Sequence, residues 1–400
     1  MSGLNGTKLL GLFPALGELG GVEASGRIAW AGLANSNRFS PENLELFEYV
    51  ANGPRGSMDK LTRFSSTNRA KLAAILRALR MHSRPGCILI WHLGLLKLVP
   101  FFRSPNADRI LYLHGIESWK RQDLLTQRMF RHVTVFLTNS DYTWSRFLSY
   151  HPEFGSSRHL TVPLGIGHSI VDIDQLRAPA AQPTVLMVGR IAGQEDYKGH
   201  RQMIEAWPLV LRRIPNARLW IVGDGDLRAE FEALAQKNSL SPSVKFWGAV
   251  SEKQKEALLL ESRCLALPSR GEGFGLVYLE AMRLGRPCLV STLDAGREVV
   301  NPPEAGLAAY PGKPDELADA LCHLLTEGDE WDKWSAQARC RYESNYTAKH
   351  FQDRLLAAMF PSVLTLEAVR SPRLESEDRQ PGELSFPSLR SSPTVRDLVN

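Results

Sequence analysis

Short apolar runs alternate with longer amphipathic stretches along most of this 400-residue chain. The runs are almost continuously apolar, as in ILYLHG at 110–115, which is typical of strands buried on both faces of a parallel sheet. Between the runs, apolar residues recur at spacings of three and four, which predicts helices. The pattern therefore predicts an α/β fold built from two doubly wound, Rossmann-like domains.

Each apolar run is interpreted as one strand. The strands expected in the first domain are Lys8–Ala15, Leu44–Val50, Cys87–Trp91, Arg109–His114, Val133–Asn139 and His159–Val162. Those expected in the second are Thr184–Arg190, Arg218–Val222, Val244–Trp247, Cys264–Pro268 and Cys288–Ser291. In open parallel sheets, ligands bind at the carboxyl ends of the strands. The residues that follow each strand are therefore the first candidates for a site.

Changes in composition set the expected domain boundaries. Residues 1–170 form the first domain and residues 184–344 the second, joined by an Ala- and Pro-rich linker at 171–183. Residues 361–400 are rich in Ser, Pro, Arg and Glu and contain too few apolar residues to fold. We expect them to form a disordered tail.

Charge is distributed unevenly between the two halves. Residues 1–170 carry 20 Lys and Arg against 11 Asp and Glu, which leaves 28 against 32 for the remainder. The cations gather between Arg55 and Arg84, in a predicted helix with Leu72, Ile75, Leu76 and Leu79 as its apolar positions. Such a helix either lies on anionic lipid or presents an ordinary solvated face. Nucleic acid is not expected as a partner, because no aromatic residues are interleaved with the cations.

Cysteine usage and hydrophobic length exclude several classes of protein. The five cysteines are scattered without a C-x-x-C pair, so neither a disulfide framework nor a zinc site is indicated. The longest apolar segment, Cys87–Phe102, is shorter than the ~20 residues of a membrane-spanning helix. The first residues lack the basic start of a signal peptide. The expected location is cytoplasmic, with peripheral contact at the inner face of a membrane as one interpretation of the basic helix.

The segment SRGEGFGLVYLEAMR at 269–283 places two carboxylates, Glu272 and Glu280, eight residues apart across a loop-to-helix junction. Glycines keep this loop free of side chains, so backbone amides can approach a ligand at the positive end of the helix, where a phosphate is favoured. Glu280 lies on an apolar helix and needs a partner. Both hydroxyls of a ribose and an i,i+3 pair with Arg283 are compatible with its position.

These residues resemble a known family. Glu272 and Glu280, with Gly-Phe-Gly between them, resemble the E-x7-E motif of retaining glycosyltransferases of family 4, which have the GT-B fold. VGRIAGQEDYKGH at 188–200 resembles the family's Arg and Lys signature, LHGIESW at 113–119 its histidine loop, and GELGGVE at 17–23 its first glycine-rich loop. The resemblance implies two Rossmann-like domains facing a cleft, with a C-terminal helix at 345–360 that crosses back to the first domain.

The resemblance also implies roles for individual residues. Arg190 and Lys198 would clamp the donor's diphosphate, so that no divalent metal and no cofactor is required. Glu272 would bind the hydroxyls of the transferring sugar, Glu280 the ribose, and His114 the donor sugar. The remaining expected donor contacts come from backbone and small residues: Gly20, Gly21, Gly273, Phe274, Gly275 and Leu276. The catalytic set is therefore Glu272, His114, Arg190 and Lys198.

Five further acidic residues, at three places in the sequence, are also considered as candidates. Glu298, in DAGREVV, either aids nucleotide binding or caps its own helix. Two D-x-D pairs invite a metal-site interpretation, which we reject. Asp172 and Asp174 lie in the linker, and Asp224 and Asp226 lie in a strand-to-helix turn where an acid caps the helix.

The expected function is metal-independent, retaining transfer of a hexose from a nucleotide diphosphate sugar. GDP-mannose is favoured as the donor, and a UDP-sugar shares nearly every motif. The expected acceptor is a glycan or a polyprenyl-diphosphate-linked glycan. Two alternatives stay open: a GT-B-fold epimerase that acts on a UDP-sugar, and a catalytically silent homologue that only binds a nucleotide.

Overall fold

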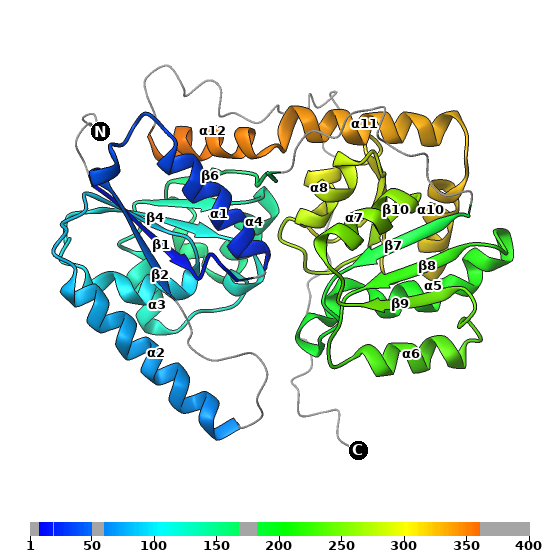
Figure 1. Ribbon diagram of the computed structural model, residues 1–400, viewed down its shortest axis with the longest axis horizontal. Coiled ribbons are helices and arrows are strands. Elements are labelled where there is room, and N and C mark those ends of the chain that lie inside the picture. Colours follow the sequence, from blue (N-terminus) through cyan, green and yellow to red (C-terminus); the bar gives the residue numbers. More distant parts are fainter. Residues whose placement is uncertain (1–7, 19, 50–59, 168–181, 361–400) are drawn as a thin grey trace. The chain divides into compact units, whose positions relative to one another are not determined.

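The computed structural model describes residues 8–18, 20–49, 60–167 and 182–360 (Figure 1). Residues up to Phe360 form one compact unit. The expected tail at 361–400 and all but the last two residues of the expected linker lie outside the described residues.

The first domain is built on a six-stranded parallel sheet. Its strands are β1 (Leu9–Pro14), β2 (Leu44–Tyr49), β3 (Cys87–Ile90), β4 (Asp108–Leu113), β5 (Val135–Thr138) and β6 (His159–Thr161). Their spatial order is β2-β1-β3-β4-β5-β6, and all six expected strands are confirmed. In β1, Leu9 pairs with both Leu44 and Cys87, which fixes the register at the centre of the sheet.

Helices cover both faces of this sheet. They are α1 (Gly21–Ala34), α2 (Lys60–Arg80), α3 (Leu124–Phe130) and α4 (Asp141–Tyr150), with 3₁₀ turns η1 (Pro41–Asn43), η2 (Leu93–Phe101), η3 (Ile116–Ser118) and η4 (Pro152–Phe154). Alternate residues of β1 enter different apolar clusters, Leu9 and Phe13 one, Leu10 and Leu12 the other. A strand covered on both sides therefore has no polar face, which explains its apolar sequence.

The second domain repeats the plan. Its strands are β7 (Thr184–Val188), β8 (Arg218–Val222), β9 (Val244–Gly248), β10 (Cys264–Leu267), β11 (Cys288–Ser291) and β12 (Gly306–Ala309). Their order is β12-β11-β10-β7-β8-β9, all parallel. The helices are η6 (Gly193–Lys198), α5 (His200–Arg213), α6 (Arg228–Lys237), α7 (Glu252–Glu261), α8 (Leu276–Arg283), α9 (Gly296–Val300) and α10 (Pro314–Leu325).

The last two helices return the chain to the first domain. α11 (Asp329–Asn345) packs on α8, and α12 (Ala348–Met359) runs beside α1 (Figure 1). The amide of Gln352 on α12 donates to the carbonyl of Ile28 on α1 at 3.0 Å. Between the two helices, Thr347 forms a parallel bridge with Ile166. The expected crossover helix is confirmed.

Both sheets contain a point where the strand order reverses. In the first sheet it lies between β1 and β3, and in the second between β7 and β10. Ligands of doubly wound sheets bind beyond the carboxyl ends of the strands at such points. The loops at these ends contain the residues singled out from the sequence.

The predicted basic helix is present as α2, but its leucines do not face the core. Helix α2 packs on η2 through an inward stripe of small residues, Ala70, Ala74 and Ala78, which are buried. Three leucines lie outward and are 43% to 58% exposed: Leu72, Leu76 and Leu79. Ile75 alone of the four expected apolar positions packs against the core. Within the described ranges, we find no helix with the length and apolar character needed to cross a bilayer.

Candidate functional site

The loop before α8 is shaped to present backbone amides. Gly275, the N-cap of α8, has φ 87°, and a Cβ there would lie 2.4 Å from the ring of Tyr278. Only glycine fits this position without strain. The first amides of a helix have no partner inside it, and among the described residues none accepts from the amides of Phe274, Gly275 or Leu276. These amides can therefore bind an anion at the positive end of α8.

Asp294 binds the backbone of this loop through its side chain. Its carboxylate accepts hydrogen bonds from the amide of Glu272 at 3.1 Å and from the amide of Gly296 at 3.0 Å. Asp294 is fully buried, and burial raises the pKa of its carboxyl to about 7. No sequence pattern marks this residue, because its partners are the backbone amides of Glu272, 22 residues away, and of Gly296 in the next turn.

Two cations and two carboxylates form a chain beside the loop. Lys198 Nζ lies 3.1 Å from Glu272 Oε2 and 3.7 Å from Glu195 Oε2, and the other oxygen of Glu195 pairs with Arg190. Burial is the largest single effect and lowers the pKa of Lys198, but Glu272, Tyr197 and Glu195 together outweigh it, so the pKa is raised. Lys198 is therefore charged at neutral pH. Arg190 is 79% exposed on its side chain, so it is free to turn toward a ligand.

Glu195 was missed by the sequence interpretation. Its carboxylate lies between the two cations expected to clamp a diphosphate. An anionic ligand on Arg190 and Lys198 must displace it. The spacing of three residues from Lys198 was the available signal.

Glu280 has a different partner from the one that its own helix offers. Its carboxylate lies 2.8 Å from Lys255 Nζ on α7, and both side chains are mostly buried. Arg283 pairs instead with Glu256 at 3.1 Å. The interpretation of Glu280 and Arg283 as an i,i+3 pair is therefore wrong. The role of Glu280 at a ribose stays a prediction, now with Lys255 beside it.

His114 lies at the end of β4, and its ring is fixed. Nε2 is 2.6 Å from the carbonyl of Trp91, and because a carbonyl only accepts, Nε2 carries the proton and Nδ1 is an acceptor. Burial lowers the pKa of His114 to about 4, so the imidazole is neutral at pH 7. The ring contacts those of Trp91 and Tyr112.

Loops from the two domains meet at the glycines. A Cβ on Gly273 would lie 2.4 Å from the carbonyl of His114, so only a glycine allows this approach. A Cβ on Gly21 would lie 3.6 Å from Leu276. Ser140 Oγ donates to the carbonyl of Gly273 at 2.8 Å. The structure thus brings most of the expected set to one place, while the atoms nearest to a Cβ on Gly20 belong to Glu23 of α1.

The remaining acidic candidates have structural partners. Asp226 accepts from the amide of Gly193 at 2.8 Å and does not cap α6, so its assignment as a helix cap is wrong. Glu298 does not cap its own helix either; it accepts from the amides of Asp141 and Tyr142 in the first domain. Asp172 and Asp174 lie outside the described residues.

Cysteines 87, 264, 288 and 322 are buried free thiols, and Cys340 is exposed.

Part of the chain is similar to a known protein family. Residues 182–327, which contain Arg190, Lys198 and both motif glutamates, match the model for "Glycosyl transferases group 1". The second domain is therefore similar to the group 1 glycosyltransferases over these residues. A GDP-mannose-dependent α-(1-6)-phosphatidylinositol monomannoside mannosyltransferase of Mycobacterium tuberculosis is 30% identical over 257 residues, 58% of this chain and 64% of the relative. The chain spans 36% to 64% of the length of the curated relatives it matches first.

Solved structures with low sequence identity share the fold of this chain. Sucrose-phosphate synthase of Thermosynechococcus elongatus superposes with a TM-score of 0.68 at 19% identity, covering 87% of this chain and 97% of that one. An Anabaena protein in complex with UDP and glucose superposes with a TM-score of 0.66 at 18% identity, covering 88% and 99%. The expected GT-B architecture is confirmed.

Proposed function

We propose that this protein transfers a hexose from a nucleotide diphosphate sugar to a glycan or lipid-linked acceptor with retention of configuration. The observation that carries the proposal is the N-terminus of α8, where the amides of Phe274 to Leu276 have no acceptor among the described residues and adjoin the Lys198–Glu272 pair. A diphosphate leaving group develops negative charge as the glycosidic bond breaks. Preorganised amides and cations stabilise the transition state, in which that charge develops, more than they stabilise the ground state.

The cations supply what a divalent ion supplies in other phosphate sites. Lys198 is mostly buried and charged, and the exposed Arg190 can close on the diphosphate once Glu195 is displaced. Glu272 then faces the sugar next to the diphosphate, and the neutral His114 offers an acceptor at Nδ1 from the opposite domain. Transfer should therefore proceed in the presence of a chelator.

Mannose is the favoured sugar. The names of relatives at 30% and 35% identity specify mannosyl transfer, from GDP-mannose in one case. A neighbour of the same fold binds UDP and glucose, so the fold accommodates both bases. We propose that the ribose binds at Glu280, whose carboxylate lies 2.8 Å from Lys255 Nζ.

The acceptor side belongs to the first domain, and an amphiphilic surface there favours a lipid-linked acceptor. The outward leucines of α2 lie among exposed cations, Lys71 and Arg80. Leu124 and Leu125 at the start of α3 are also exposed, and α2 and α3 both pack against η2. Leucine and cationic side chains together suit the surface of an anionic bilayer, so we propose peripheral membrane contact here.

Nucleotide titration tests the donor site. We expect GDP and GDP-mannose to raise the melting temperature, since a ligand at 100 times its Kd stabilises by ~2.7 kcal/mol. Lys198→Met should abolish this stabilisation. Lys253→Met, which removes an exposed lysine of α7, should leave it unchanged. A shift with UDP species alone would reassign the donor, and no shift with either nucleotide would contradict the proposal.

A further inference from the structure

Glu298 connects the two domains through its carboxylate. Oε2 accepts from the amide of Asp141 at 2.8 Å and Oε1 from the amide of Tyr142 at 2.7 Å. Glu298 lies on α9 of the second domain, and the two amides begin α4 of the first. A negative charge at a helix N-terminus is stabilised by the helix dipole and by the free amides together.

The four amides at the start of α4 are all accounted for. Thr143 donates to Ser140 Oγ at 3.1 Å and Trp144 to the carbonyl of Ser140 at 3.4 Å. The other two are those held by Glu298. Since the first amides of a helix have no partner within it, the helix is completed by a residue from the other domain.

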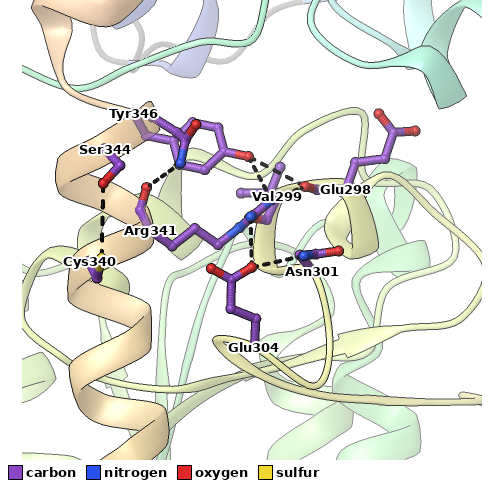
Figure 2. A network of polar contacts seen from close by, with 9 residues as sticks. Glu298, Val299, Asn301, Glu304, Cys340, Arg341, Ser344 and Tyr346 are labelled. Carbon is purple, nitrogen blue, oxygen red and sulfur yellow. Dashed lines mark hydrogen bonds and ion pairs between the residues drawn. The ribbon is translucent and has the colours of Figure 1, made fainter. Parts of the chain in front are cut away.

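A second network fixes the backbone that carries Glu298 (Figure 2). Arg341 of α11 donates to the carbonyls of Val299 at 2.6 Å and of Glu298 at 2.8 Å, and pairs with Glu304 at 2.9 Å. These carbonyls end the short helix α9, where no intrahelical donor remains. The carboxylate of Glu298 points away from Arg341. The guanidinium of Arg341 therefore binds the backbone of Glu298, and the side chain of Glu298 binds α4.

The same junction contains the catalytic loops. Ser140, the N-cap of α4, donates from Oγ to the carbonyl of Gly273 at 2.8 Å. Asn139, one residue earlier, donates from Nδ2 to the carbonyl of His114 at 2.6 Å. Any displacement of the start of α4 therefore moves contacts to both the Glu272 loop and His114.

We propose that Glu298 is a positioning residue for transfer: by docking on the N-terminus of α4, it sets the distance between His114 and the Glu272 loop. This inference rests on the proposed function for its effect on turnover. Glu298 touches neither the α8 amides nor the Lys198–Glu272 pair. It acts on the reaction through the contact between α9 and α4 and leaves the donor site of the second domain intact.

Glu298→Gln tests the role, since glutamine keeps the size but can accept from only one of the two amides. We expect kcat to fall roughly tenfold, about the effect of one charge-assisted hydrogen bond, with the KM for the donor nearly unchanged. Glu304→Gln is the matched control, because it removes a charge from the same network without touching α4. It should keep near-normal kcat.

The contact can also be tested from α4, by removing the backbone amide of Asp141. Asp141→Pro removes the amide that Glu298 Oε2 binds, and proline is tolerated in the first turn of a helix. Ser140, at φ −153° and ψ 156°, already has the conformation that precedes a proline. Asp141→Ala keeps the amide and is the control. We expect Asp141→Pro to lower kcat, Asp141→Ala not to, and Asp141→Pro to add nothing in a Glu298→Gln background.

Hydrogen exchange separates this inference from the proposed function. The amides of Asp141 and Tyr142 should exchange faster in Glu298→Gln than in the wild type or in Glu304→Gln, whether or not a donor is turned over. Unchanged exchange at these amides would overturn the inference. So would a wild-type kcat in Glu298→Gln, or a kcat loss equal to that of Glu304→Gln. Failure of the wild type to transfer any sugar would instead refute the proposed function.

Discussion

The buried Asp294 makes the stability of this protein depend on pH in a defined direction. Burial raises the pKa of this carboxyl from 3.8 to about 7 in the folded protein. Between these values the folded state keeps a proton that the unfolded state has lost. The free energy of unfolding therefore falls as pH rises from 4 to 7, by about 4 kcal/mol for this group, and is constant above.

Other groups contribute with the opposite sign. Burial lowers the pKa values of His114, His159 and His200 to about 4, so each loses its stabilising effect as pH falls from 6.5 toward 4. The dependence of the wild-type free energy of unfolding on pH therefore contains the contributions of both Asp294 and the histidines. Asp294→Asn removes only the carboxyl, so the difference between variant and wild type isolates it.

Urea unfolding at pH 4.5, 6 and 8, followed by two spectroscopic probes to check cooperativity, measures this difference. Asparagine accepts from only one of the two amides at Glu272 and Gly296, so the variant should be less stable at pH 4.5. As pH rises, the variant should gain on the wild type by several kcal/mol. A difference that does not change with pH would refute the reasoning.

Two further predictions follow from charges and exposed side chains. Glu195→Gln removes a carboxylate that competes with the ligand for Lys198, and at ~4 Å the two charges attract by about 4 kcal/mol at an effective dielectric of 20. Part of this energy should appear as a several-fold lower Kd for GDP, measured by calorimetry. An unchanged or higher Kd would contradict the displacement of Glu195. Replacing Leu72, Leu76 and Leu79 by serine should abolish sedimentation of the protein with anionic vesicles, since each leucine contributes about 1.5–3 kcal/mol when buried. Tyr310→Ser, which changes an exposed aromatic residue of the second domain, is the control. Equal vesicle binding by both variants would exclude the membrane contact.

The sequence was sufficient where the signal is local. Continuous apolar runs identified eleven of the twelve strands in the part of the chain that the structure describes, because strands covered on both faces are apolar throughout. β12 was missed because Gly306–Ala309 is short and three of its four residues are glycine or alanine, which are depleted in strands. The motif around Glu272 was found because its glycines and acids lie within one loop and one helix.

The long-range partners could not be predicted in this way. Lys255 lies on another helix from Glu280, and Glu298 acts on a helix of the other domain. Asp294 binds backbone amides, which leave no mark in the sequence of the partner. The leucines of α2 have helical spacing like a buried face, but alanines at 70, 74 and 78 allow the helix to pack closely by another side.

Sugar transfer tests the central claim most directly. Purified protein would be incubated with GDP-mannose or UDP-glucose, a lipid-linked glycan fraction and a chelator, and the product linkage determined by NMR. We expect a mannosylated product that retains the α-configuration of the donor, formed without divalent metal and lost in Glu272→Gln. Transfer with inverted configuration, a requirement for metal, or full activity of Glu272→Gln would contradict the account.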